Sequence, residues 1–207
     1  MKIEKIYPRG FASNAYLVTA DGKTGLVIDP SGEHVAERAQ TMGLTVTHVL
    51  LTHGHFDHVG GVNAFRALGA RVMCGVEEEA AIGTQALLLS YADEENLHFP
   101  IDGVFFDGER KILCGLSVTC IAVPGHTAGS CVYLIKDGKT GEEALFTGDT
   151  LFLGTIGRTD LPTGDGAEMM KSLRKIAQME KNYPVYAGHG EDTTLDEEKK
   201  NNPFLGL

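Results

Sequence analysis

The sequence predicts one α+β domain, residues 1–207, in which sheets pack face to face with helices outside. Three observations support this fold class. Apolar, β-prone runs and helical runs occur in both halves of the chain. Glycine-containing turns join neighbouring strands into local hairpins. The length of 207 residues is enough for one substantial hydrophobic core.

The first half begins with a predicted hairpin. Residues 14–19 and 25–29 are apolar and β-prone, and Asp21-Gly22 between them favours a tight turn. Residues 33–42 are expected to form a helix that ends at Gly43. The nearly continuous apolar run over 45–52 indicates a strand that is buried on both faces. The remaining expected elements of this half are a helix over 61–68, a strand over 71–74, a helix over 76–91 and a loop-rich segment over 97–107.

The second half is richer in strands. A helix over 166–180 is expected because Met169, Leu173 and Ile176 recur at helical spacing on one face. The other expected elements are strands over 111–114, 116–123, 130–136, 143–147 and 183–187, and a short helix over 193–200.

Composition narrows the possible partners. The formal net charge of −10 disfavours nucleic acid, because an acidic surface repels phosphate backbones. No apolar run is long enough to span a membrane, and the N-terminus lacks the apolar core of a signal peptide, so we expect a cytoplasmic protein. The four cysteines form no C-x-x-C pair and are expected to be reduced core thiols. No pattern indicates the oligomeric state.

The strongest functional signal directly follows the predicted strand over 45–52. Four potential metal ligands lie within six residues: His53, His55, Asp57 and His58. An extended backbone would direct His53 and His55 to the same side, and Asp57 and His58 on the next turn could reach a second point nearby. If these side chains were only structural, the fold would gather titratable groups with nothing to satisfy them.

Three more ligand-type residues stand where predicted strands end, each flanked by glycine. His126 lies in a Pro/Gly turn between two strands, Asp149 follows the strand over 143–147, and His189 follows the last strand. Each signal alone is weak. Four such strand ends in one chain are hard to explain by coincidence, and functional loops usually occupy these positions.

Together these residues resemble the metallo-β-lactamase superfamily, whose H-x-H-x-D-H loop matches residues 53–58 without a gap. The resemblance covers nearly the whole chain and implies an αββα sandwich of two mixed sheets. It also implies two metal ions at the strand ends. His53, His55 and His126 would hold one ion, Asp57, His58 and His189 would hold the other, and Asp149 would bridge both. Such ligands suit zinc, which we expect, and also iron or manganese.

Within that superfamily, residues 148–152 and 157–165 and the ending Asn202-Pro203-Phe204 resemble short bacterial hydrolases of the glyoxalase II type. This likeness implies hydrolysis of a small-molecule thioester such as S-lactoylglutathione by a water shared between two metals. Asp57 would also orient that water. Full-length glyoxalase II has a C-terminal helical domain that holds glutathione, and this chain ends about where that domain would begin. The resemblance therefore does not imply how glutathione would be bound.

Arg158 has two interpretations. It could hold a substrate carboxylate, or it could form a structural ion pair with Asp160 or Asp165.

Two other functions compete with hydrolysis. Persulfide dioxygenases share the family's core and use one iron held by positions that match His53, His126 and Asp149. A non-catalytic metal-binding protein is the other alternative. Nuclease activity is disfavoured by the acidic charge balance.

Overall fold

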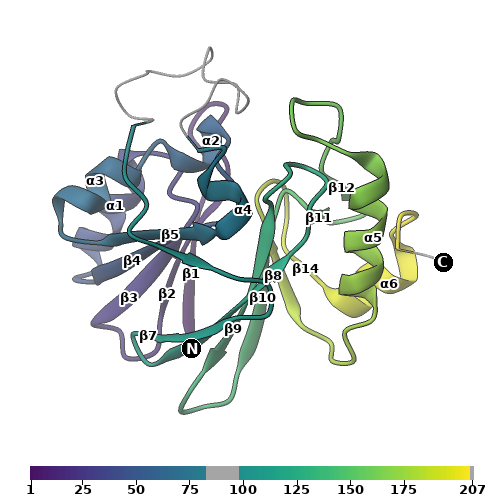
Figure 1. Cartoon of the computed structure of the whole chain (residues 1–207). Coiled ribbons are helices and arrows are strands. Elements are labelled where there is room, and N and C mark those ends of the chain that lie inside the picture. The colour runs from purple at the N-terminus through teal and green to yellow at the C-terminus, as the bar shows by residue number, and fades with distance from the viewer. Residues whose placement is uncertain (83–97, 206–207) are drawn as a thin grey trace.

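The computed structural model describes residues 1–82 and 98–205 and contains two six-stranded sheets that face each other (Figure 1). The first sheet consists, in spatial order, of β1 (Lys2–Ile6), β2 (Ala15–Thr19), β3 (Thr24–Ile28), β4 (Thr45–Leu51), β5 (Arg71–Gly75) and β6 (Gly103–Phe105). The second consists of β14 (Thr193–Thr194), β13 (Pro184–Ala187), β10 (Glu143–Gly148), β9 (Cys131–Asp137), β8 (Leu116–Ala122) and β7 (Arg110–Leu113). A small ribbon pairs β11 (Leu151–Phe152) with β12 (Thr155–Ile156).

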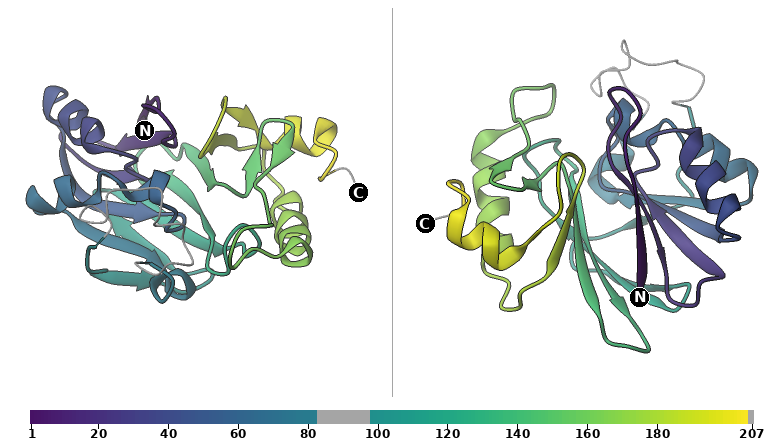
Figure 2. Two further views of the ribbon diagram at one scale, coloured as in Figure 1. Left: turned by 90° about the horizontal axis from the view of Figure 1, so that it is seen from above. Right: turned by 180° about the vertical axis from the view of Figure 1, so that it is seen from behind.

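Helices cover the outer faces of both sheets, as the two views of Figure 2 show. The first sheet is covered by α1 (Glu33–Thr41) and α3 (Val62–Ala67), and the second by α5 (Gly166–Ala177) and α6 (Leu195–Asn201). Two one-turn helices, α2 (Phe56–Val59) and α4 (Val76–Glu79), lie in the loops. Both sheets contain parallel and antiparallel pairs, so the predicted αββα sandwich of mixed sheets is confirmed.

Strand β4 shows why the apolar run over 45–52 is continuous. Leu50 belongs to the core between the two sheets, while Val49 and Leu51 belong to the core beneath α1 and α3. All three side chains are fully buried because each face of the strand packs against another layer.

Helix α5 also forms as its sequence predicts. Asp165 caps it, since its carboxylate accepts hydrogen bonds from the amides of Ala167 and Glu168. Met169 and Ile176 on its apolar face are buried in the third core, between this helix and the second sheet.

The expected helix over 76–91 is confirmed only at its start, where α4 forms, and is wrong over residues 80–82. Helix α4 ends at Glu79 and is followed by a turn, in which the amides of Ala81 and Ile82 both donate to the carbonyl of Glu78. Residues 83–91 lie outside the described residues. The segment expected to be loop-rich contains β6, which forms by parallel pairing with β5.

Several short strands were not predicted. β1 pairs with β2, β11 pairs with β12, and β14 replaces the first two residues of the helix expected over 193–200. Thr194 instead caps α6, because its hydroxyl accepts from the amide of Glu197.

Strand directions place several carboxyl ends at the same edge of the sandwich. β8, β10 and β13 run the same way in the second sheet, as β3 and β4 do in the first. The two sheets are joined at that edge. The Tyr133 hydroxyl donates to the Leu51 carbonyl at 2.9 Å, and the Tyr16 hydroxyl donates to the Ala187 carbonyl at 2.6 Å.

Two expectations from composition can be compared with the structure. The four cysteines are free thiols, as predicted; Cys74, Cys120 and Cys131 are buried and Cys114 is half-buried. None of the helices in the described part of the chain combines the length and apolarity needed to cross a bilayer.

Candidate metal centre

All seven predicted ligand residues converge at one edge of the sandwich. His53 and His55 follow β4, Asp57 and His58 lie on α2, His126 lies between β8 and β9, Asp149 follows β10, and His189 follows β13 (Figure 1). Side chains that are up to 136 positions apart therefore meet because the strands before them end together.

The first cluster consists of His53, His55 and His126, all buried. One ring nitrogen from each lies within 4.8 Å of the others. The ring of His53 meets those of His55 and His126 edge to face with centroids 4.7 Å apart. This is an arrangement in which three imidazole nitrogens point at a common centre.

The second cluster consists of Asp57, His58 and His189. Asp57 Oδ2 lies 3.2 Å from Nε2 of His189 and 3.7 Å from Nε2 of His58. His58 is fully buried, whereas the side chain of His189 is 39% exposed. The second cluster therefore lies on the solvent side of the centre.

Asp149 stands between the two clusters. Its Oδ2 lies 3.5 Å from Nε2 of His126 and 3.4 Å from Nε2 of His189. Its Oδ1 lies 3.4 Å from Nε2 of His58. One carboxylate thus reaches both sets of imidazoles, as a bridging ligand must.

Unpaired polar atoms show that this centre fits cations. Among the described residues, Nε2 of His53, His55 and His58 and Oδ1 of Asp149 are buried without a hydrogen-bond partner. Leaving such atoms unpaired costs free energy, and all four belong to side chains of the two clusters or to Asp149 between them. Divalent cations bound by these lone pairs would satisfy them.

In His58 and His126 the ring nitrogen that faces away from Asp149 is held by another group of the protein. Nδ1 of His58 lies 3.0 Å from Oδ2 of Asp29, and Nδ1 of His126 lies 2.8 Å from the carbonyl oxygen of Arg158. Because that carbonyl can only accept, Nδ1 of His126 carries the proton and Nε2 keeps its lone pair. Such contacts fix the tautomer and orientation of a metal-binding histidine.

Asp29 was missed by the sequence analysis. It follows β3, accepts hydrogen bonds from the amide and hydroxyl of Thr52, and orients His58. Its position directly after a predicted strand and before Pro30 is the signal that could have identified it.

In the first cluster and at Asp149 the local electrostatics favour the protonation states that bind cations. Burial lowers the pKa of His55 to about 4 and holds that of His53 well below its usual value, so both stay neutral. Burial alone would raise the pKa of Asp149, but the facing imidazoles, His58 first, hold it well below its usual value. A neutral imidazole and an ionised carboxylate are the forms that ligate metals. At His58 and His189 burial lowers the pKa, but the facing carboxylates of Asp149 and Asp57 outweigh burial and raise it, so a cation there would displace a proton.

A cavity of about 380 Å³ opens onto this centre. It is lined by His55, Phe56, Asp57, His126, Asp149, Phe152, Gly157, Arg158, Leu161 and His189. This volume lies within the range of small-molecule sites, and three apolar side chains stand beside the polar floor.

Arg158 forms the ion pair that the sequence allowed, with Asp160 as its partner, and it also remains able to contact a substrate. Its guanidinium forms two hydrogen bonds with Asp160, at 2.7 and 2.8 Å, while Asp165 caps α5 instead. The Arg158 side chain is 61% exposed and that of Asp160 is 68% exposed, so water screens the pair. Arg158 also lines the cavity and remains within reach of a ligand there.

Position 188 has room only for glycine, because side chains of the metal centre lie directly against it. A Cβ at this position would lie 2.2 Å from Oδ1 of Asp149 and 2.8 Å from Cε1 of His58. We expect Gly188→Ala to lower the activity of a metal centre at this site by about 10²-fold, because it displaces two candidate ligands. Gly166→Ala is the control, since its Cβ would make only an ordinary 3.4 Å contact. Activity and metal content measured on both variants test this; wild-type values for Gly188→Ala would show that the ligands tolerate displacement.

Comparison with known proteins agrees with this geometry. The model of the metallo-β-lactamase superfamily matches residues 8–189. Hydroxyacylglutathione hydrolase GloC of Haemophilus influenzae is 34% identical, over 99% of this chain and 98% of its own. The crystal structure of BLEG-1 B3 metallo-β-lactamase superposes with a TM-score of 0.87 at 31% identity and covers 100% of both chains. TTHA1623 in a di-iron-bound form gives a TM-score of 0.79 at 32% identity, over 99% of this chain and 100% of its own.

The match to the family model spans every predicted ligand from His53 to His189, and the converging clusters supply the donors that this family needs. This chain therefore belongs to the metallo-β-lactamase superfamily and is a metal-dependent hydrolase of that family.

Proposed function

We propose that this protein hydrolyses the thioester of a small acyl group, with S-lactoylglutathione as the first substrate to test. The observation that carries the proposal is the pair of ligand clusters sharing Asp149 at the floor of a cavity of about 380 Å³. The similarity to a hydroxyacylglutathione hydrolase over nearly the full length of both chains supports a thioester as the substrate.

The seven side chains would divide between two cations. His53, His55 and His126 would hold one, Asp57, His58 and His189 the other, and Asp149 both. Two bound cations would lower the pKa of a shared water towards about 7 and polarise the acyl carbonyl. Iron is an alternative to zinc, because a relative that is 32% identical has been solved in a di-iron-bound form.

Asp57 would also orient the attacking water. Its side chain is 16% exposed, so one carboxylate oxygen can face the cavity while the other lies near His189. Such a carboxylate accepts a hydrogen bond from the water and directs its lone pair at the acyl carbon.

The leaving group needs little help from the protein. A free thiol has a pKa of about 8.5, so a thiolate departs without a strong general acid. Phe56, Phe152 and Leu161 would form the apolar wall against which the acyl-thiol packs.

Arg158 is proposed to hold a carboxylate of the substrate at the cavity rim. Arg158→Ala should then raise KM by about 10- to 100-fold and change kcat little, because a hydrogen bond to a charged group contributes about 1.5–3 kcal/mol. Asp160→Asn is the matched variant: it removes the competing carboxylate, so KM should stay the same or fall. Steady-state kinetics test both variants, and an unchanged KM for Arg158→Ala would leave Arg158 with only its ion pair.

The proposed reaction can be separated from its rivals by three assays on the same metal-loaded protein. S-lactoylglutathione tests thioester hydrolysis, glutathione persulfide with oxygen-uptake measurement tests the dioxygenase, and a chromogenic cephalosporin tests β-lactam hydrolysis. The last assay is included because a B3 metallo-β-lactamase is 31% identical over the whole chain. We expect thiol release from the thioester to be fastest. Oxygen uptake without thioester loss, or β-lactam cleavage alone, would overturn the proposal.

A further inference from the structure

Glu78 is a fully buried carboxylate on α4 that the proposed reaction does not use. Its Oε1 accepts a hydrogen bond from the amide of Gly54 at 2.8 Å, and its Oε2 accepts one from the hydroxyl of Thr127 at 2.7 Å. The amide of Gly129 donates to it as well. A carboxylate that is 0% exposed persists only when its oxygens are hydrogen-bonded, and these donors fulfil that need.

The partners of Glu78 are neighbours of three ligands. Gly54 lies between His53 and His55, and Thr127 directly follows His126. One side chain therefore joins the two loops that carry the whole first cluster.

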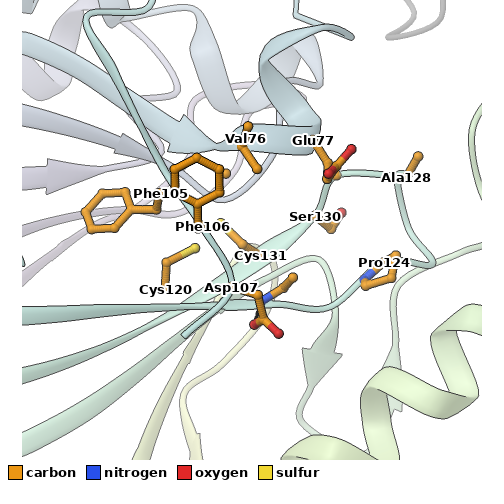
Figure 3. Close-up of a pocket in the computed structure, with 13 residues that line it drawn as sticks. Val76, Glu77, Phe105, Phe106, Asp107, Cys120, Pro124, Ala128, Ser130 and Cys131 are labelled. Carbon is orange, nitrogen blue, oxygen red and sulfur yellow. Dashed lines mark hydrogen bonds between the residues drawn. The ribbon is translucent and has the colours of Figure 1, made fainter. Parts of the chain in front are cut away.

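The backbone packs closely at the same junction. A Cβ at Gly129 would lie 2.2 Å from the backbone nitrogen of Glu78, so α4 and the loop after His126 touch without a side chain between them. Figure 3 shows the outer side of this junction, where Glu77 lies beside Ala128 and Ser130 at the rim of a second cavity of about 240 Å³. Glu77 faces that cavity, whereas its neighbour Glu78 turns inward to the ligand loops.

We propose that Glu78 is a positioning residue that sets the spacing of the two loops carrying His53, His55 and His126. It thereby sets the affinity of this first cluster, the first metal pocket, for its cation. The inference rests on the proposed metal centre. It goes further by assigning a role to a residue that touches neither the cations nor the substrate.

The physical reason is the small tolerance of a metal site. Ligand atoms must be held within about 0.5 Å of their productive geometry, which requires support from the surrounding residues. Without the Glu78 carboxylate, the Gly54 amide loses its acceptor and the two loops lose the hydrogen bonds that join them through this side chain. Removing a group that orients metal ligands typically weakens metal binding by about 10- to 100-fold.

The test measures the two stepwise Zn²⁺ affinities of the full chain by competition with a chromogenic chelator. His55→Ala and His189→Ala show which step belongs to which pocket, because each removes a ligand from one cluster only. We expect Glu78→Ala to weaken the first pocket by about 10- to 100-fold and to leave the second within about threefold. Glu78→Gln should restore part of the loss, since its amide oxygen can still accept from Gly54.

Glu198 offers a matched control for loss of a buried carboxylate. It is 1% exposed and accepts hydrogen bonds from the amide of Gly154, the hydroxyl of Thr193 and the side chain of Asn202. Glu198→Gln should lower Tm but leave both Zn²⁺ affinities unchanged. If Glu78→Ala does not fold, the comparison is made with Glu78→Gln and Thr127→Val, which both perturb this junction more gently.

Each outcome decides the inference. Equal weakening of both pockets, or no change in either, would overturn it and leave Glu78 a stabilising residue of the fold. A wild-type protein that fails to bind two equivalents of metal would instead overturn the proposed metal centre.

Discussion

Asp149→Asn is expected to lower kcat/KM for the thioester by about 10³-fold and to reduce the metal content. The Asp149 carboxylate lies within 3.5 Å of a nitrogen on His58, His126 and His189, so it is placed to serve both clusters. An amide is a weaker, neutral ligand, and loss of about 4 kcal/mol of metal-based stabilisation corresponds to this factor. Steady-state kinetics and elemental analysis of the purified variant measure the two effects.

Asp137 provides the matched control for this substitution. It is also buried, with 1% exposure, and accepts hydrogen bonds from the amides of Lys139 and Thr140. It lies at the end of β9, which runs opposite to β10 and therefore ends at the other edge of the sheet. Asp137→Asn should reduce stability without changing metal content. An Asp149→Asn variant with normal activity would show that the two pockets do not depend on a shared carboxylate.

Removal of the metals is expected to abolish hydrolysis and to lower Tm by about 8–16 °C. A ligand that binds only the folded state stabilises it by about 4 kcal/mol at 1,000 times its Kd, and each kcal/mol shifts Tm by about 2–4 °C in a chain of this size. The expected loss of stability follows from the buried atoms of His53, His55 and Asp149 that have no hydrogen-bond partner, because removal of the cations would leave them unsatisfied. Chelation followed by thermal denaturation measures the shift.

Restoring the cations should reverse both effects. Zn²⁺, Mn²⁺ or Fe²⁺ should recover stability, whereas Mg²⁺ should not, because it prefers oxygen ligands and this centre offers five imidazoles. A chelated protein with unchanged Tm and activity would contradict the metal-dependent assignment.

The elements that could be predicted from the sequence are those whose own packing imposes a recognisable order of apolar and polar residues. β4 reads as a continuous apolar run because both of its faces are buried, and α5 shows both an apolar stripe and a capping aspartate. β6 and β14 could not be predicted in this way. They are two or three residues long and exist because neighbouring strands offer them hydrogen-bond partners.

The candidate site also contains residues that could be predicted from the sequence and residues that could not. The seven candidate ligands could be named from the sequence because each is a metal-binding residue type in a loop that follows a strand, and the structure brings all seven together. Glu78 carries no such signal, since it is one of three consecutive glutamates and its role depends on burial between two loops. Arg158 is a different case: the sequence allowed an ion pair with Asp160 or with Asp165, and the structure selects Asp160 as the partner.

The central claim is that seven side chains hold two cations at one edge of the sandwich. A crystal structure of the protein grown with Zn²⁺, with anomalous diffraction measured at the zinc edge, tests it most directly. We predict two peaks about 3.5–4 Å apart, one bound by His53, His55 and His126 and one by Asp57, His58 and His189, with Asp149 between them. A single peak, or zinc bound away from these residues, would contradict the claim.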